Sequence, residues 1–441
     1  MKNRLTISKI ISQYFDKRLL WVFFMGCASG FPWVLIGSNM FGWLKDSGLS
    51  KTDTGLFGSI FTIYAVNFLW APLVDRVKLP FLTRNLGQIR GWILLAQFCI
   101  LLATLALTLL DPGHELKFVL IAAMLIAFAS ATQDIAVDAF RIDSFGIDEK
   151  SKLPMASAMG VIGWWTGYSL PGYLAFTNAD ACGWNGVYQG MAGLVCLLML
   201  MTLLVPEPVT DRARIQKEAE ARFTGKGSLT AWLAVTVYEP FAEFFRRNGS
   251  RLALTLILFI FLFKIGEAFL GRMSIPFYKE IGFSNQQIGY YSKLIGWGVT
   301  IFFTIVGSIV NVKFGIVRGL LIGGIAMAGS NLMFAWLAAV GPNEQILLAA
   351  IIVDNFTSAF ATIAFVSFLT FFTGRGFTAT QYALLASVGN FGRTSLASFS
   401  GMVAEWLGSW AMFFTLTKVM VVPSLLLLLS LRPYFKDMDE L

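Results

Sequence analysis

Long apolar segments alternate with short polar ones along the whole chain. A membrane-spanning helix needs about 20 consecutive, mostly apolar residues. By this measure the sequence predicts twelve transmembrane helices, at residues 19–42, 54–74, 90–110, 117–141, 154–178, 185–205, 251–275, 286–310, 317–340, 345–371, 378–402 and 407–431. We therefore expect an all-α membrane protein with its surface against the lipid bilayer.

The longest polar gap divides the predicted helices into two sets of six. We expect an N-terminal six-helix bundle at residues 1–205, a cytoplasmic linker at 206–250 and a C-terminal six-helix bundle at 251–441. The linker opens with Pro206-Glu207-Pro208, which cannot extend a helix. It ends in an amphipathic segment from Trp232 to Arg247, which we expect to lie along the membrane surface.

Composition supports a membrane protein and excludes other classes. Of 441 residues, 56% are hydrophobic and 14% are charged, and the mean hydropathy is +0.68. Soluble domains carry about 25% charge. The net charge of +8 comes from 34 Lys and Arg against 26 Asp and Glu. Most of these cations fall on one side of the predicted helices, and the other side has only Lys45, Lys51, Lys117 and Lys279. The positive-inside rule then places both termini in the cytoplasm, and no nucleic-acid partner is expected.

The sequence gives no sign of a metal site, a cofactor or an active site. The four cysteines, Cys27, Cys99, Cys182 and Cys196, are scattered, without a C-x-x-C motif or a nearby His. The loops contain no set of residues typical of a catalytic nucleophile. We expect a protein that is not an enzyme, acting as a monomer.

Some ionisable residues remain within the predicted helices, where each charge is costly and points to function. They are Asp134, Asp138, Lys264, Glu267, Arg272, Lys293, Asp354, Arg393 and Lys418. A charge at mid-depth must be paired or face a wet cavity. We predict that Glu267, Asp134, Asp138 and Asp354 take part in proton coupling.

Two groups of these charges have alternative interpretations. Asp138 and Arg141 are spaced to form a structural ion pair, with Asp134 a turn deeper and facing a cavity. Lys264 and Glu267 could neutralise each other permanently. Alternatively, Lys264 binds a substrate carboxylate while Glu267 alternates between a proton and its ionic partner. Arg393 could anchor a second carboxylate, or instead bridge two helices.

Aromatic and amide side chains complete the predicted binding set. Most aromatic residues of a membrane protein face lipid or lie at the interface. Trp164 and Trp165 differ because they stand beside Gly163 and Gly167. The predicted substrate-binding residues are Lys264, Arg393, Gln133, Trp164, Trp165, Asn355, Gln381 and Trp43.

Corresponding positions of the two halves resemble each other. Gly160-x-x-Gly163 in the fifth helix matches Gly389-x-x-Gly392 in the eleventh, and Gln133-Asp134 in the fourth matches Asp354-Asn355 in the tenth. Two related six-helix bundles around a central pathway form the major facilitator fold. The segment with Asp75, Arg76 and Lys78 resembles the cytoplasmic gate motif of that superfamily, although it lacks most of the motif's glycines. We assign Asp75, Arg76 and Arg141 to the gate.

The chain also resembles one family within this superfamily, the AmpG-type muropeptide permeases. The motifs that carry the resemblance span nearly all twelve predicted helices. They are Gly30-Phe-Pro32, Phe68-Leu-Trp70-Ala-Pro72-Leu-x-Asp75-Arg76, Gln133-Asp134-Ile-x-x-Asp138-Ala-x-Arg141, Gly183-Trp184, Lys264-Ile-Gly266-Glu267-Ala-Phe269 and Phe377-Thr-Ala-Thr-Gln381-Tyr-Ala-Leu-Leu385.

The resemblance implies proton-powered import from the periplasm across the inner membrane of a Gram-negative bacterium. The implied substrates are cell-wall fragments, N-acetylglucosamine linked to anhydro-N-acetylmuramic acid, with or without a peptide. Their sugar rings and carboxylates suit the predicted aromatic and cationic residues. The alternative is a related importer of another bulky solute, such as a siderophore or acetyl-CoA.

Overall fold

The computed structural model describes residues 14–49, 57–146, 149, 152–208, 238–283, 287, 290–291, 295–397 and 399–431. The regular elements of this part are helices. Lys293 lies outside the described residues, as do the side chain of Arg272 and the beginning of the predicted amphipathic segment, at 232–237.

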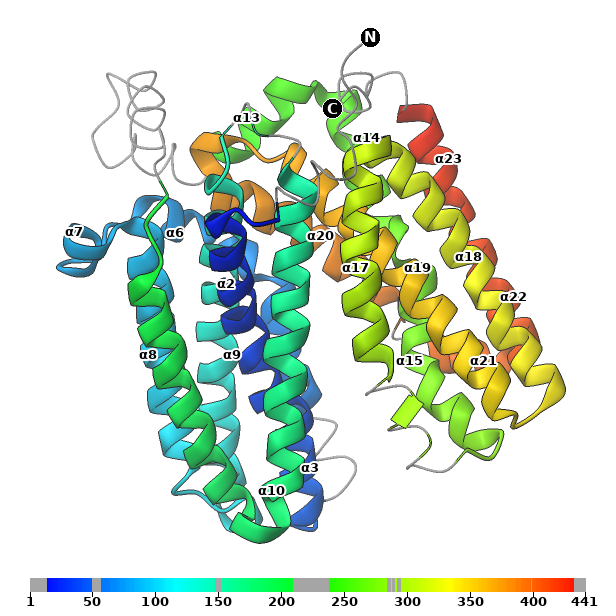
Figure 1. Ribbon diagram of the computed structural model, residues 1–441, viewed down its shortest axis with the longest axis horizontal. Coiled ribbons are helices and arrows are strands. Elements are labelled where there is room, and N and C mark those ends of the chain that lie inside the picture. Colours follow the sequence, from blue (N-terminus) through cyan, green and yellow to red (C-terminus); the bar gives the residue numbers. More distant parts are fainter. Residues whose placement is uncertain are drawn as a thin grey trace.

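The helices that precede the linker group together on one side of Figure 1. They are α2 (Lys17–Val34), the π-helical turn η1 (Leu35–Asn39), α3 (Met40–Asp46), η2 (Gly58–Phe61), α5 (Thr62–Ala65), η3 (Asn67–Leu69), α6 (Ala71–Arg76), α7 (Leu82–Leu86), α8 (Gln88–Leu107), α9 (Pro112–Asp143) and α10 (Leu153–Leu204). We call this group the first bundle.

The helices that follow the linker form a second group, the second bundle, beside the first (Figure 1). They are α14 (Ser250–Phe263), α15 (Ile265–Glu280), α17 (Gly296–Phe314), α18 (Ile316–Val340), α19 (Glu344–Phe371), η7 (Arg375–Phe377), α20 (Thr378–Ala397), α21 (Ser400–Leu407), α22 (Trp410–Met420) and α23 (Val422–Leu431). The short helix α13 (Glu239–Asn248) precedes this bundle and is the described part of the predicted amphipathic segment.

Nine helical segments of the described chain are long and apolar enough to cross a membrane. The remaining predicted runs are also helical where they are described. In the run 54–74, the described residues 57–74 form several short helices. Residues 154–178 lie in the first part of α10, and the run 378–402 contains α20 and the start of α21.

Two backbone irregularities shape the long helices. Gly183 has a φ of 67° inside α10 and separates the predicted fifth and sixth helices. Glycine populates this left-handed region without the steric cost that a Cβ imposes. The second irregularity is at Lys264, which is not helical and separates α14 from α15. The predicted seventh helix is therefore interrupted at the residue that carries its deepest cation.

Glycines allow close packing at equivalent places in the two bundles. A Cβ on Gly163 of α10 would lie 2.2 Å from the carbonyl oxygen of Phe23 in α2. A Cβ on Gly392 of α20 would lie 2.5 Å from the carbonyl oxygen of Phe261 in α14. Both distances are too short for any side chain, so these helices approach backbone to backbone. Each glycine pair identified in the sequence thus packs its helix against the first long helix of its own bundle.

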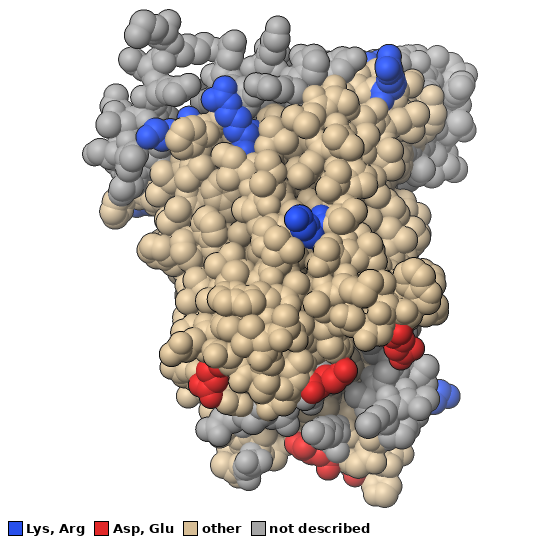
Figure 2. All heavy atoms as spheres, turned by 90° about the vertical axis from the view of Figure 1, so that its right-hand side faces the viewer, with Lys and Arg blue, Asp and Glu red and all other residues tan. Residues whose placement is uncertain are grey.

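Charge is distributed unevenly along the axis of the molecule. Figure 2 shows most of the Lys and Arg on this face towards one end and the Asp and Glu towards the other end, where one further blue group also lies. The broad band between the two ends has a single blue group on this face. Apolar side chains are exposed over the surface, including Phe302, Trp406 and Leu426. Such an apolar surface is expected where lipid replaces water. We call the end at which α2 and α20 begin and α9 ends the basic side.

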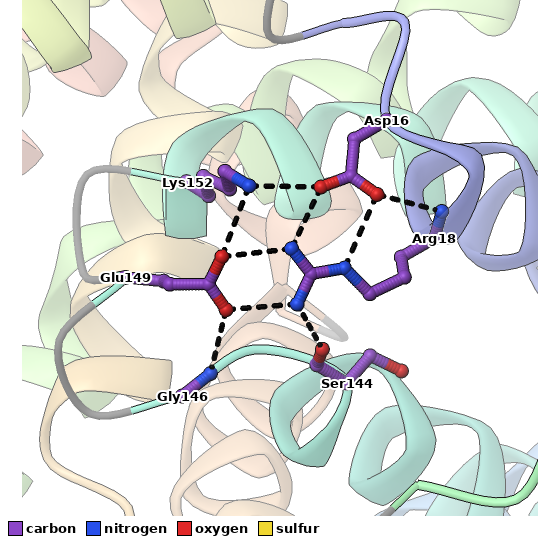
Figure 3. A network of polar contacts seen from close by, with 6 residues as sticks. All are labelled: Asp16, Arg18, Ser144, Gly146, Glu149 and Lys152. Atoms are coloured by element: carbon purple, nitrogen blue, oxygen red, sulfur yellow. Dashed lines mark hydrogen bonds and ion pairs between the residues drawn. The ribbon is translucent and has the colours of Figure 1, made fainter.

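An ion-pair network joins three segments of the first bundle on the basic side (Figure 3). Arg18 lies between two carboxylates, with Nη2 2.7 Å from both Asp16 Oδ2 and Glu149 Oε1. Lys152 Nζ also contacts both, at 2.8 Å from Asp16 and 3.0 Å from Glu149. The network ties the start of α2 to the α9–α10 connection and to the start of α10.

These partners hold both carboxylates in the charged form. Hydrogen bonds from Arg18 and Lys152 lower the pKa of Glu149 to about 2. The same two cations, Arg18 first, lower the pKa of Asp16 well below its ordinary value. A carboxylate with a lowered pKa stabilises the fold at any pH above its ordinary pKa, and this contribution disappears as the pH falls towards the lowered value.

We predict that Glu149→Gln lowers the thermal unfolding temperature of the detergent-purified protein by about 1–3 °C at pH 7. The difference from the unsubstituted protein should be constant between about pH 8 and pH 5.5. It should shrink below about pH 4.5, because there Glu149 takes up a proton in the unfolded chain while it stays ionised in the folded protein. Thermal unfolding of both proteins over this range is the measurement. A difference that changes between pH 8 and pH 5.5 would contradict the assignment.

Candidate functional site

The N-terminus of α20 meets carboxylates from the other bundle. Asp75, in α6, accepts hydrogen bonds from the backbone N–H groups of Ala379 at 3.3 Å and Thr380 at 2.8 Å, and from the Thr380 hydroxyl at 2.7 Å. Asp143, the last residue of α9, accepts one from the Thr378 hydroxyl at 3.0 Å. The first N–H groups of a helix lack partners within the helix and carry partial positive charge. The first bundle therefore supplies the anionic cap that α20 needs.

Arg141, two residues before Asp143 in α9, connects the same two bundles. Its side chain is only 5% exposed and its guanidinium donates to the Thr370 hydroxyl in α19 at 2.9 Å. It also pairs with Asp138 at 3.1 Å and lies over the ring of Tyr382, 5.0 Å from its centroid. The predicted Asp138–Arg141 pair is thus formed, and its arginine additionally crosses to the second bundle.

Further contacts between the bundles lie at the same end. Ser367 donates to Ser157 at 3.3 Å, Ser387 donates to Asn67 at 2.8 Å, and Tyr14 hydrogen-bonds to Ser308. Apolar side chains fill the space around them: Val312, Ala379 and Ala383 of the second bundle pack into a core cluster of the first. We call all these contacts the basic-side closure. From it the helices of the two bundles diverge towards the opposite end (Figure 1).

A group of charges lies inside the second bundle at the break between α14 and α15. Lys264 Nζ is 2.9 Å from Glu267 Oε2 and donates to the Thr362 hydroxyl at 2.7 Å. Ser358 donates to the other oxygen of Glu267 at 2.7 Å. Lys264 is 9% exposed and the Glu267 side chain 23%. The ion pair is therefore screened from water but not sealed.

Two more of the predicted residues belong to this group. Asp354, in α19, accepts from the Ser330 hydroxyl at 3.3 Å and interacts electrostatically with Glu267 and Lys264. Arg393, in α20, is exposed and interacts electrostatically with Glu267. The structure thus brings together Lys264, Glu267, Asp354 and Arg393, which we call the charged cluster. With two acidic and two basic members, the charged cluster is formally neutral when all four are ionised. A proton on one of the carboxylates therefore leaves it with a net positive charge.

The deep carboxylate of the first bundle has an aromatic environment. Asp134 accepts from the Ser29 hydroxyl of α2 at 2.6 Å. Tyr64 interacts electrostatically with this carboxylate. The Trp33 ring lies 4.4 Å from the ring of Tyr64 and 5.8 Å from that of Trp164, measured between centroids. The predicted proton-coupling residue Asp134 is therefore linked through Tyr64 and Trp33 to Trp164, one of the predicted aromatic residues.

These rings form one continuous group. Trp164 stacks on Tyr168 at 5.4 Å and meets Trp165 edge to face at 5.3 Å, and Trp33 stacks on Phe61 at 4.9 Å. We call Trp33, Phe61, Tyr64, Trp164, Trp165 and Tyr168 the aromatic cluster. Backbone contact between α2 and α10 brings it together, because a Cβ on Gly30 would lie 2.0 Å from the carbonyl oxygen of Trp164.

Four other predicted binding residues lie outside both clusters. Gln133 donates to the carbonyl of Ala28 at 2.5 Å, and Asn355 accepts from Thr300 at 3.0 Å, so each amide joins neighbouring helices. Gln381 contacts α13, and Trp43 is 4% exposed and packs on Tyr188. Arg76 is the last residue of α6, on the basic side beside Asp75.

Several residues of the closure were missed in the sequence. Asp143, Thr378 and Thr380 were not singled out because none lies deep in a predicted helix. A usable signal does exist: Gly374-Arg-Gly-Phe followed by Thr378-Ala-Thr380 resembles a helix start, where Thr side chains are favoured. In the described part of the chain, no group of three His, Cys, Asp or Glu side chains could hold a metal ion.

Comparison with known proteins identifies the family. Residues 22–395 match the model of the Major Facilitator Superfamily. The chain is 32% identical over 426 residues to a putative transporter AmpG 4 of Rickettsia conorii, covering 97% of this chain and 98% of that protein. It is 33% identical over 410 residues to the anhydromuropeptide permease of Escherichia coli K12, covering 92% and 78% respectively.

Solved structures agree on the fold. A structure of the proton:xylose symporter XylE superimposes with a TM-score of 0.69 at 14% identity, covering 95% of this chain and 96% of that one. The human organic anion transporter MFSD10 superimposes with a TM-score of 0.66 at 16% identity, covering 94% and 99%. The major facilitator fold expected from the sequence is therefore confirmed. The chain belongs to the Major Facilitator Superfamily of membrane transporters and, within it, to the AmpG-type permeases.

Proposed function

We propose that this protein imports cell-wall muropeptides together with protons across the bacterial inner membrane, acting as a monomer with its basic side in the cytoplasm. The observation that carries the proposal is the charged cluster, which pairs Lys264 with Glu267 at 2.9 Å at a helix break in an AmpG-type chain. The relative from Escherichia coli is named an anhydromuropeptide permease, and the substrate class proposed here follows that name.

The basic-side closure defines the conformation that would accept substrate. With Asp75 and Asp143 bound to α20, the cytoplasmic side is shut and the bundles diverge towards the periplasm. Delivery to the cytoplasm requires these contacts to break while the bundles close on the other side, which is alternating access. Asp75, Arg76 and Arg141 retain the gate role predicted from the sequence, and Asp143 joins them.

The charged cluster offers a way to couple protons to substrate. While Glu267 is ionised it holds Lys264 in an ion pair. A proton on Glu267 removes that partner, and the Lys264 ammonium then binds a substrate carboxylate instead. Arg393, exposed beside the pair, provides a second cation that can bind a carboxylate bidentately. In this scheme Asp354 and Asp134 are further carboxylates that can take up a proton, and Asp138 stays paired with Arg141.

The aromatic cluster suits the other part of the substrate. Sugar rings present apolar C–H faces that pack on aromatic rings, and their hydroxyl groups need polar partners nearby. Trp164 and Trp165 provide ring faces, and Asp134 and Tyr64 provide polar groups beside Trp33. The proposed site therefore uses the first bundle for the disaccharide and the second bundle for the carboxylates.

The decisive experiment is uptake into proteoliposomes. Labelled N-acetylglucosaminyl-anhydro-N-acetylmuramic acid, with and without its peptide, should accumulate when the external pH is below the internal pH. A protonophore should abolish accumulation. A ferric siderophore and acetyl-CoA, tested in parallel, should not be taken up. Uptake that ignores the proton gradient would refute coupling, and uptake of either alternative solute in place of the muropeptide would refute the substrate assignment.

We predict that Glu267→Gln reduces proton-driven accumulation by about tenfold or more. The amide can neither take up a proton nor form an ion pair with Lys264, so it cannot alternate between these two states. Exchange of external for internal substrate at equal pH should persist, since it needs no net proton movement. Asp111→Asn, an exposed carboxylate between α8 and α9, is the matched control and should leave both activities unchanged. Equal loss of accumulation and exchange in Glu267→Gln would contradict the coupling role.

A further inference from the structure

The linker helix α13 is attached directly to the first turn of α20. Gln381, the fourth residue of α20, is 1% exposed. Its Nε2 donates to the carbonyl of Pro240 in α13 at 2.8 Å, and its Oε1 accepts from the backbone N–H of Gly374 at 2.6 Å. One buried amide thus connects the linker helix, the α19–α20 connection and the start of α20.

Two charged residues of α13 complete the attachment. Arg247 Nη2 donates to the carbonyl of Phe372 at 2.6 Å and to Gln381 Oε1 at 3.3 Å. Glu243 accepts from Gln381 Nε2 at 2.5 Å and lies 3.6 Å from Arg247. These side chains close tightly around Gly374, where a Cβ would lie 2.8 Å from Gln381 Oε1 and 3.1 Å from both Arg247 and Glu243. We call Glu243, Arg247 and Gln381 the linker clamp.

An apolar contact between α13 and the second bundle also supports the clamp. Phe244 of α13 is 1% exposed and belongs to the core cluster that contains Phe372 and Tyr382 of the second bundle. Ile142, at the end of α9 in the first bundle, belongs to the same cluster. The linker helix therefore reaches the boundary at which the bundles meet, beside the residues that form the closure.

The clamp acts on the part of α20 that the closure uses. Thr380, whose N–H and hydroxyl bind Asp75, is the residue immediately before Gln381. The terminal turn of a helix frays easily, because its N–H groups lack partners within the helix. A turn held by Gln381 and Arg247 presents those groups to Asp75 in a fixed direction.

We propose that the linker clamp positions the first turn of α20 for capping by Asp75 and Asp143, so that the linker sets how long the basic side stays closed. The inference rests on the proposed transport function for its meaning but not for its test. Glu243, Arg247 and Gln381 are positioning residues: they act through α20, and none of them contacts the charged cluster's Lys264–Glu267 pair in the described structure.

Closure can be measured without substrate. Val312 is 8% exposed and packs between the bundles, so a cysteine there reports access to the basic side. The reporter Val312→Cys is placed in a chain whose four native cysteines are replaced, and alkylation by N-ethylmaleimide is followed in detergent. A second reporter, Ile351→Cys, lies 3% exposed in a core cluster confined to the second bundle.

We predict that Arg247→Ala increases the alkylation rate at position 312 about tenfold, because the closed state loses hydrogen bonds to a charged donor. The matched control is Arg246→Ala, one residue earlier on the same helix. Arg246 is 55% exposed and pairs with Glu239 within α13 at 2.7 Å. The Arg246→Ala substitution should leave the alkylation rate at position 312 unchanged. Gln381→Leu, which keeps the volume but removes the amide, should act in the same direction as Arg247→Ala.

Three results would overturn the inference: equal rates for Arg247→Ala and Arg246→Ala, no increase in Gln381→Leu, or an equal increase at positions 312 and 351. The last would mean that the substitutions loosen the whole bundle. Because no substrate is present, these results leave the transport proposal standing. Conversely, a selective increase at position 312 in a protein without muropeptide uptake would support the clamp and refute the substrate.

Discussion

The closed side of this transporter depends on the electrostatic capping of a single helix. The first N–H groups of α20 have no partners within the helix, and Asp75 of the other bundle accepts from those of Ala379 and Thr380. Asp143 of the same bundle adds a hydrogen bond from the Thr378 hydroxyl. A carboxylate at a helix N-terminus makes charge-assisted hydrogen bonds and also meets the positive end of the helix dipole. Because donors and acceptors belong to different bundles, the basic side opens only when these bonds are lost. The apolar packing of Val312, Ala379 and Ala383 is then exposed as well.

The charged cluster is built to be sensitive to a single proton. Each oxygen of Glu267 has a partner, Ser358 on one and Lys264 on the other. Burying an ion pair costs free energy that the pair recovers only while both members are charged. Neutralising Glu267 leaves Lys264 with Thr362 and with the nearby Asp354. The helix break at Lys264 places this imbalance in the middle of a span, where a change of charge has the greatest effect on packing.

The sequence predicted the helices well because each is a long apolar run, and it predicted the ion pairs Asp138–Arg141 and Lys264–Glu267 because they are local in sequence. It did not predict which way the amides point. Gln381 and Asn355 fall in apolar runs like the other predicted binding residues, yet Gln381 contacts α13 and Asn355 contacts Thr300. Their direction is set by helices distant in sequence. Asp143 was missed because it lies just beyond the predicted fourth helix, and its partner Thr378 is distant along the chain.

The central claim, that Asp75 and Asp143 hold the basic side closed, is tested most directly by a distance measurement between the bundles. Spin labels replace Arg84 in α7 and Arg318 in α18, both exposed on the basic side of opposite bundles. Pulsed dipolar spectroscopy compares the native gate with the double substitution Asp75→Asn and Asp143→Asn. We predict that the substituted protein gains a population with a longer interbundle distance at the expense of the shorter one. An unchanged distance distribution would contradict the claim.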